Sequence, residues 1–269
     1  MKRTLGFIGA GNMASAIISG VAGGEASGVE QVLVYDLDAA KPQRLSEKFS
    51  LVRACAGAQE VVSRADVLVL AVKPQNFEQV LAEIAPAVNR EAVVVSIAAG
   101  IPASYIKSQL GFDAKVVLVM PNTPLMLREG ATALSRVAPT GEEEFQFVKG
   151  LFAQSGVACE IDPGQMNEII AVNGSTPAFI YLFAKGFLAY AKREGIDDQA
   201  ALTLFSQTLI GSAKMLTDSG LSVDELIKMV SSPGGTTLAG LQAFYDHGFE
   251  GEILDACERC VKRAYELSK

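Results

Sequence analysis

Short apolar runs alternate with helix-like stretches over the first 160 residues of the chain. The runs at 67–70 (VLVL) and 93–95 (VVV) show no alternation with polar residues, which is typical of strands in a sheet covered on both faces. Between the runs, apolar residues recur every three or four positions, as at 77–84, which predicts amphipathic helices. This alternation predicts an α/β domain with a doubly wound parallel sheet. The expected strands cover 5–9, 31–36, 67–71, 93–97, 116–120, 131–135 and a segment near 157–161.

The pattern changes at residue 162, after which only helices are expected. The helix expected over 176–194 is apolar almost all round, which indicates a place at the centre of its domain or against another chain. Because the helices of this half make a thin domain, we expect dimerisation through it. We therefore predict an α/β domain over 1–161 and an all-α domain over 162–269. The other expected helices cover 165–173, 197–218, 222–230, 236–246 and 250–268.

Composition and charge narrow the class of protein. The chain has 269 residues, of which 49% are apolar, and a formal net charge of −7. These values exclude a disordered or fibrous chain, and the acidic balance argues against nucleic acid or an anionic membrane surface as a partner. The most apolar later segment, 177–191, is too short to span a bilayer and contains a lysine. We therefore expect a cytoplasmic protein without a membrane span.

The four cysteines are too few and too scattered for a disulfide framework, which fits a reducing compartment. Cys257 and Cys260 form a CxxC pair, but no second pair and only one histidine, His247, accompany it. We therefore expect no metal site and interpret the pair as two small residues on one helix face.

A glycine-rich turn at 9–14 (GAGNMA) follows the first expected strand and opens a helix. The first glycine permits a tight turn, the second lets a pyrophosphate approach the backbone, and Ala14 is small enough for the helix to pack on the strand. N–H groups and the positive dipole at the helix start favour phosphates. The motif alone is a weak signal, but this strand–turn–helix setting predicts a dinucleotide site. The predicted cofactor contacts here are Ile8, Gly9, Ala10, Gly11, Asn12 and Met13.

Asp36 lies at the end of the second expected strand. In a dinucleotide-binding fold, an acid at this place hydrogen-bonds the ribose 2′-hydroxyl and repels a 2′-phosphate. For like charges roughly 4 Å apart, the repulsion is up to about 4 kcal/mol at an effective dielectric near 20. Asp38 adds to the acidity, whereas Lys41 and Arg44 partly offset it. We therefore favour NADH over NADPH as the cofactor; the alternative is that Asp36 is only a solvated residue at the strand end.

Three later turns also follow expected strands, at the edge of the sheet where ligands bind. Lys73 in the AVKP turn is either a ligand or an ordinary surface lysine. The AAG turn at 98–100 follows the next strand. In MPNTP, two prolines fix a loop that exposes Asn122, either beside a nicotinamide or simply as a rigid turn. The predicted cofactor contacts here are Ala71, Val72, Lys73, Pro74, Ala98, Ala99, Gly100 and Asn122.

The second half contains a glycine-rich turn of its own, SSPGGTT at 231–237, between two expected helices. The glycines free the backbone, and Thr236 or Thr237 can cap the following helix. The N–H groups of such a turn suit a small carboxylate, but spacing alone does not distinguish this site from an ordinary turn between helices. The junction NGSTP at 173–177 opens the apolar helix and is a second candidate for the border of a cleft.

Seven phrases occur in order over nearly the whole chain: GFIGAGNMASAI, AVKPQ, VSIAAGI, MPNTP, NGSTPAF, GSAKML and VSSPGGTTLAGL. Each phrase alone is weakly specific, whereas all seven in this order are highly specific. On these motifs the chain resembles the pyrroline-5-carboxylate reductase family, whose members catalyse the last step of proline biosynthesis.

The resemblance implies an N-terminal Rossmann domain and a C-terminal helical domain that forms an intertwined homodimer, with dimers assembled into a decamer as a pentamer of dimers. It also implies that NADPH or NADH reduces the C5=N bond of 1-pyrroline-5-carboxylate to give L-proline. By position, Gly235 and Thr236 N–H groups would meet the substrate carboxylate, and Thr237, the one catalytic residue, would hydrogen-bond the ring nitrogen. The substrate-binding residues carried over in this way are Ser232, Gly234, Gly235, Thr236 and Thr237.

Departures from the family pattern, at Asp36, Ala58 and Thr176, and two alternatives accompany the resemblance. Asp36 stands where the family usually has Ser or Thr with basic neighbours, and this departure favours NADH. A β-hydroxyacid dehydrogenase would share the plan of a Rossmann domain followed by helices, but neither Lys185 nor Lys214 matches the spacing of its catalytic lysine. A nucleotide-binding module without turnover is the second alternative.

Overall fold

The computed structural model describes residues 2–23 and 28–267, and the chain divides into two compact units. The first comprises Met1–Pro177 together with Arg259–Lys269, and the second comprises Ala178–Glu258.

This division differs from the predicted boundary between residues 161 and 162. The segment that follows residue 161 stays with the first unit because Met166 and Ile170 are buried in its core. Ala264, near the end of the chain, is buried in the same core. The first unit is therefore discontinuous in sequence, which the hydrophobic pattern did not predict.

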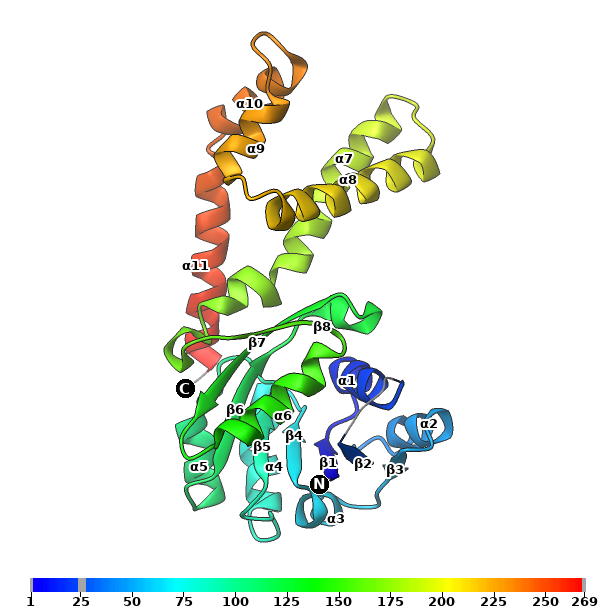
Figure 1. Ribbon diagram of the computed structural model, residues 1–269, viewed down its shortest axis with the longest axis vertical. Coiled ribbons are helices and arrows are strands. Elements are labelled where there is room, and N and C mark those ends of the chain that lie inside the picture. The colour runs from blue at the N-terminus through cyan, green and yellow to red at the C-terminus, as the bar shows by residue number, and fades with distance from the viewer. Residues whose placement is uncertain (1, 24–27, 268–269) are drawn as a thin grey trace. The chain divides into compact units, whose positions relative to one another are not determined.

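The first unit is built on an eight-stranded sheet with the strand order β3-β2-β1-β4-β5-β6-β7-β8 (Figure 1). All seven expected strands are confirmed, and the short β3 is an addition to them. The strands are β1 (Arg3–Ile8), β2 (Val29–Tyr35), β3 (Val52–Ala54), β4 (Val67–Leu70), β5 (Val93–Ser96), β6 (Lys115–Met120), β7 (Gly130–Val137) and β8 (Gly156–Glu160).

The sheet is parallel from β3 across to β6, but β7 runs antiparallel to β6, with Val117 opposite Arg136. The expectation of a wholly parallel sheet is therefore wrong at this strand. The connection at 121–129 is too short for the crossover that a parallel neighbour requires, so the chain turns back on itself. β8 is again parallel to β7.

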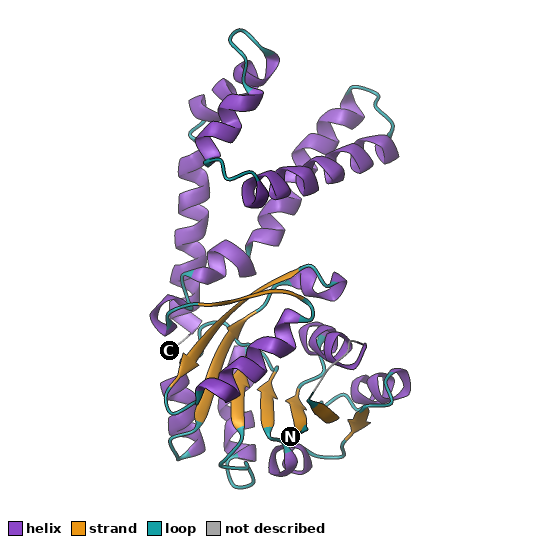
Figure 2. Cartoon of the chain, in the orientation of Figure 1, coloured by secondary structure: helices purple, strands orange, loops and turns teal. Residues whose placement is uncertain are grey.

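Helices cover both faces of the sheet (Figure 2). In β4, Val67 and Val69 enter the core on one face, whereas Leu68 and Leu70 enter the core on the other. Both cores are apolar, which explains why the central strands show no polar alternation. One core includes residues of α1 (Asn12–Gly23), α2 (Ala40–Lys48) and α6 (Glu142–Ala153); the other includes residues of α3 (Ala58–Arg64), α4 (Phe77–Ile84) and α5 (Ala103–Leu110).

Short irregular helices replace the single helix expected over 165–173. A 3₁₀ helix, η3 (Pro163–Gln165), begins where Oδ1 of Asp162 accepts a hydrogen bond from the N–H of Gly164 at 2.7 Å. A π-helix, η4 (Ile170–Gly174), follows it. The prediction of an α-helix was therefore wrong in the type of helix. A π-helix and an α-helix of this length bury similar apolar positions, so the hydrophobic pattern does not distinguish them. Two further 3₁₀ helices, η1 (Pro74–Asn76) and η2 (Thr123–Leu127), follow β4 and β6.

The second unit is all-helical, as expected (Figure 1). Five phenylalanine rings form a cluster in it, with centroid separations from 4.8 to 6.4 Å. Outside the cluster, large apolar side chains stay exposed, among them Tyr181, Leu182 and Leu204 at 63%, 69% and 69%. The helices are α7 (Thr176–Arg193) and α11 (Phe249–Leu267), each shared with the first unit, and α8 (Asp198–Asp218), α9 (Val223–Val230) and α10 (Thr236–Asp246).

β7 and β8 approach each other closely at Gly156. Its φ is 138°, and a Cβ there would lie 2.0 Å from the carbonyl oxygen of Gly130. These backbone atoms cannot separate without breaking the β7–β8 ladder, so we expect Gly156→Ala to lower the free energy of unfolding by more than about 2 kcal/mol. Urea denaturation followed by circular dichroism measures the loss.

Gly150→Ala is the matched control, because Gly150 lies inside α6, where an added Cβ would meet no atom within 4 Å. There the better helix propensity of alanine is expected to raise stability by up to about 1 kcal/mol. Equal unfolding midpoints for the two variants would contradict the account of the β7–β8 contact.

Candidate active site

The carboxyl ends of β1, β2 and β4 meet at the glycine turn that follows β1. The N–H of Gly9 donates to the carbonyl of Tyr35 at 2.8 Å, and the N–H of Ala71 donates to the carbonyl of Ile8 at 2.8 Å. Gly9 has a φ of 100°, and a Cβ there would lie 2.6 Å from the carbonyl oxygen of Ala71. Only glycine fits both the conformation and the space.

The other side of this turn faces open space. A Cβ on Gly11 would meet no atom within 4 Å, Asn12 is exposed, and Met13 is half-buried. No acidic side chain occupies the first turn of α1, so the first N–H groups of the helix suit an anion such as a pyrophosphate. Ile8 and Ala10 are buried, each 3% exposed, so we expect them to shape the turn rather than to contact a cofactor with their side chains.

Asp36 binds the glycine turn through its carboxylate. Oδ2 accepts from the N–H of Ala10 at 2.7 Å, and Oδ1 accepts from the N–H of Asp38 at 2.9 Å and from the ammonium of Lys41 at 3.3 Å. Burial alone would raise the pKa of Asp36, whose side chain is 14% exposed, but these donors outweigh burial and hold the pKa below its ordinary value. A fixed negative charge therefore stands at the end of β2 at neutral pH.

The residues predicted after β4 and β5 lie at the same edge of the sheet. The turn at 71–74 is half-buried except for Lys73, which is exposed. In the turn at 98–100, the N–H of Ala98 donates to Oγ of the buried Ser96 at 3.4 Å. The positions of both turns fit a dinucleotide that lies across the strand ends. Their contacts with a cofactor stay predictions.

Asn122 is turned into the protein. It is 9% exposed, its Oδ1 accepts from the N–H of Ala131 at 2.9 Å, and its Nδ2 donates to the carbonyl of Asn173 at 3.3 Å. Both polar atoms are committed to backbone groups, which favours the alternative of a rigid turn over direct contact with a nicotinamide. The neighbouring Thr123 is the exposed side chain of this loop.

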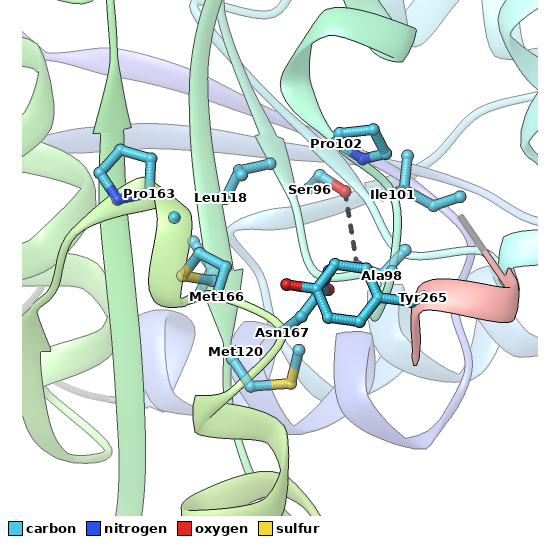
Figure 3. Close-up of a pocket in the computed structure, with 13 residues that line it drawn as sticks. Ser96, Ala98, Ile101, Pro102, Leu118, Met120, Pro163, Met166, Asn167 and Tyr265 are labelled. Atoms are coloured by element: carbon cyan, nitrogen blue, oxygen red, sulfur yellow. Dashed lines mark hydrogen bonds between the residues drawn. The ribbon is translucent and has the colours of Figure 1, made fainter. Parts of the chain in front are cut away.

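A cavity of about 220 Å³ lies beside the turn at 98–100 (Figure 3). Its walls come from the ends of β5 and β6, the start of α5, the segment around η3 and the last turns of α11. Most of the lining is apolar, and Ser96 and Tyr265 bring hydroxyl groups to it. The hydroxyl of Tyr265 donates to Oε1 of Glu168 at 2.6 Å, which raises the pKa of Tyr265. Tyr265 was not predicted as a site residue, because no local motif in the sequence indicates that the end of the chain lies near the ends of β5 and β6.

The second glycine-rich turn joins α9 to α10 in the second unit. Gly234 has a φ of 72°, and a Cβ on Gly235 would lie 2.5 Å from Oγ of Ser232. Gly235 is the N-cap of α10 and supplies no side chain to its N–H groups, while Thr236 and Thr237 are exposed. A helix start of this kind can accept a small carboxylate, with two hydroxyl groups beside it.

Within residues 2–23 and 28–267, no group of three or more His, Cys, Asp and Glu side chains is placed to hold a metal ion. The four cysteines are free thiols, and burial raises the pKa of Cys55. In the same part of the chain, every helix is too short or too polar to cross a membrane.

Two family models match the chain in succession. One, described as NADP oxidoreductase, coenzyme F420-dependent, matches residues 4–100, and the other, described as pyrroline-5-carboxylate reductase dimerisation, matches residues 163–267. The pyrroline-5-carboxylate reductase of Escherichia coli is 34% identical over 269 residues, which cover 100% of both chains.

Two solved structures are similar over almost the whole chain. A pyrroline-5-carboxylate reductase from Coxiella burnetii has a TM-score of 0.90 at 29% identity and covers 100% of both chains. The pyrroline carboxylate reductase of Plasmodium falciparum, crystallised with NADP bound, has a TM-score of 0.89 at 27% identity, covering 99% of this chain and 98% of that one. These matches confirm the predicted fold class, a Rossmann-like domain followed by a helical dimerisation domain.

The lowered pKa of Asp36 gives a testable dependence of stability on pH. An ionised Asp36 contributes stability that is complete above the unfolded-state pKa of about 3.9 and is lost as the pH falls through the lower folded-state pKa. At neutral pH, Asp36→Asn should lower the free energy of unfolding by about 1–3 kcal/mol, because hydrogen bonds to a charged acceptor are lost. The difference from wild type should shrink below about pH 4 in urea denaturation at a series of pH values.

Asp38→Asn is the control, because the carboxylate of Asp38 is 57% exposed and lies 3.9 Å from Lys41. This variant should stay within about 0.5 kcal/mol of wild type. A destabilisation by Asp36→Asn that is constant over the whole pH range would refute the charged role of Asp36.

Proposed function

Because the chain belongs to the pyrroline-5-carboxylate reductase family, we propose that it reduces the C5=N bond of 1-pyrroline-5-carboxylate to give L-proline, the last step of proline biosynthesis. It is an NAD(P)H-dependent oxidoreductase, in which the reduced nicotinamide supplies a hydride to C5 and the ring nitrogen gains a proton. The observation that carries the proposal is the 34% identity over the full length of both chains. The relatives do not favour the β-hydroxyacid dehydrogenase alternative.

The turn at 231–237 binds and orients the substrate in this proposal. The N–H groups of Gly235 and Thr236 bind the substrate carboxylate at the start of α10, where the helix dipole favours negative charge. Ser232 and Gly234 shape the turn, and the hydroxyl of Thr237 binds the ring nitrogen. A protonated imine is already electrophilic, so the reaction needs no strong side-chain acid and can take its proton from water. The main contribution of the protein is positioning, because the reacting carbons must approach within about 3–3.5 Å.

We also propose that the enzyme prefers NADH. Asp36 is ionised and is fixed by two backbone N–H groups at the place expected for the ribose 2′-hydroxyl. A 2′-phosphate would meet a like charge there, and the nearby Lys41 is already paired with Asp36 and Asp38 at 3.3 and 3.9 Å. The Plasmodium relative was crystallised with NADP, so this preference would distinguish the present chain from it.

The chain carries the dimerisation domain of its family and forms a homo-oligomer. The exposed apolar side chains of α7 and α8 supply the surface that such an interface buries. We propose a homodimer that assembles further into a decamer, as a pentamer of dimers. A functional division into a dinucleotide-binding part over 1–161 and a substrate-binding and dimerisation part over 162–269, and a cytoplasmic location, are proposed on the same basis.

The cofactor preference is tested by the ratio of kcat/KM for NADH and NADPH with the imine as substrate. We expect the wild-type ratio to exceed about 10, and Asp36→Ser to lower it by about 10–100-fold, because the charge that repels the 2′-phosphate is removed. Asp38→Asn, which changes an exposed acid, should alter the ratio by less than about threefold. A strong preference of the wild-type enzyme for NADPH would remove Asp36 from this role.

Thr237 is tested by removing its hydroxyl. Thr237→Ala should lower kcat/KM for the imine by about 10–1000-fold, while fluorescence titration shows nearly unchanged affinity for NADH. Thr237→Ser keeps the hydroxyl and should stay within about fivefold of wild type. Wild-type activity in Thr237→Ala would refute the assignment. Binding of NADH or NADPH by the wild-type chain without imine-dependent oxidation of either cofactor would refute the proposed function and support a nucleotide-binding module.

A further inference from the structure

Two asparagine side chains, Asn122 and Asn173, connect three segments at the carboxyl end of β6. Nδ2 of Asn173 donates to the carbonyl of Met120, the last residue of β6, at 2.9 Å, and to the carbonyl of Ala131 in β7 at 3.0 Å. Asn122 makes two further hydrogen bonds. Its Oδ1 accepts from the N–H of Ala131, and its Nδ2 donates to the carbonyl of Asn173. We call Asn122 and Asn173 the amide pair.

One polar atom of the amide pair lacks a hydrogen-bond partner among the residues that the structure describes. Oδ1 of Asn173 is buried and has no hydrogen-bond partner within the described chain. Turning the amide around would place this oxygen against the carbonyl oxygens of Met120 and Ala131, so the chemistry of the two acceptors fixes the orientation. A buried acceptor without a partner costs about 1–3 kcal/mol.

The backbone of η4, the helix that contains Asn173, is also held in place by local contacts. η4 is a π-helix, a form that is rare and often marks a functional site. The hydroxyl of Thr176 lies 2.6 and 2.7 Å from the carbonyl oxygens of Ala171 and Val172 and donates back into the helix. A Cβ on Gly174 would lie 3.3 Å from Sδ of Met120, so the helix approaches the end of β6 closely.

The amide pair lies close to residues that we propose to contact the cofactor. β6 lies beside β5, with Leu118 opposite Ser96, and the turn that follows β5 at 98–100 is one of the proposed cofactor contacts. Met120 lines the cavity beside that turn (Figure 3). The amide pair therefore fixes the backbone of the neighbouring loop, at 120–123, on the same edge of the sheet.

We propose that Asn122 and Asn173 are positioning residues for hydride transfer. The inference rests on the proposed function and adds to it. The amide pair does not touch the reacting atoms; it holds the loop at 120–123 and the turn at 173–175 in one geometry. Because hydride transfer is steeply sensitive to the distance and angle of approach, a loop shift of about 1 Å is enough to slow it by about 100-fold.

The test removes the amide of Asn173 and separates binding from chemistry. Asn173→Ala should lower kcat by about 10–100-fold, while KM for NADH and for the imine stays within about threefold. With NADH deuterated at the transferred position, the isotope effect on kcat should rise in the variant, because hydride transfer becomes more strongly rate-limiting. The double variant with Asn122→Ala should be no slower than the slower single variant, because both changes break one network.

Gln154→Ala is the matched control. Oε1 of Gln154 is the other buried amide oxygen without a partner in the described residues, and Gln154 lies outside the amide pair. This variant should keep kcat and the isotope effect of wild type. If Asn173→Ala does not fold, Asn122→Asp keeps the acceptor for Ala131, loses the donor to Asn173, and should lower kcat by about 3–10-fold with the same rise in the isotope effect.

Two results distinguish the failure of this inference from the failure of the proposed function. A folded Asn173→Ala with wild-type kcat and isotope effect, or single-variant effects on kcat that multiply in the double variant, would overturn the positioning role alone. A wild-type chain that oxidises neither NADH nor NADPH in the presence of the imine would overturn both proposals.

Discussion

The site depends on the close approach of the glycine turn after β1 to the end of β4. Gly9 lies so near the carbonyl of Ala71 that any side chain would overlap it, and its positive φ adds a second reason for glycine. The approach brings three parallel strand ends together and leaves the N–H groups at the start of α1 facing outward. The proposed dinucleotide site thus depends on a close backbone contact.

Asp36 serves this turn in two ways at once. Its carboxylate accepts from the N–H of Ala10 and so helps to hold the turn, and in our proposal the same charge faces the position at which a cofactor carries either a ribose hydroxyl or a phosphate. In our proposal, the structural role and the cofactor-selective role therefore belong to one carboxylate. If Asp36 selects the cofactor as proposed, a substitution that relaxes this choice also removes a hydrogen bond to the N–H of Ala10, so cofactor preference and local stability would change together.

The parts of the structure that could be predicted are those that local pattern and burial decide. The uninterrupted apolar runs of β4 and β5 indicate that these strands are buried on both faces. The helices of the second half are predicted by apolar residues that recur every three or four positions. The direction of β7 depends on the length of the loop before it, and β3 is too short and too polar, with Arg53 at its centre, to give a signal. The glycine turn and Asp36 were placed correctly at strand ends. The inward turn of Asn122 and the return of Tyr265 to the first unit depend on partners far away in the sequence, which no local pattern reports.

Several pKa shifts among the described residues have structural causes. Perturbed pKa values commonly mark catalytic groups, yet the shifts at Lys115, Glu144 and Glu225 arise from ion pairs and a helix cap. The turn at 231–237 (SSPGGTT) contains no acidic, basic or cysteine side chain that could act as a general acid near neutral pH. If a protonated imine needs only a hydride and the correct orientation relative to the nicotinamide, the reaction rate depends most on residues that fix backbone positions. Glycines that permit close approaches are groups of this kind, and in our proposal so are the amides of Asn122 and Asn173, which hold the loop at 120–123.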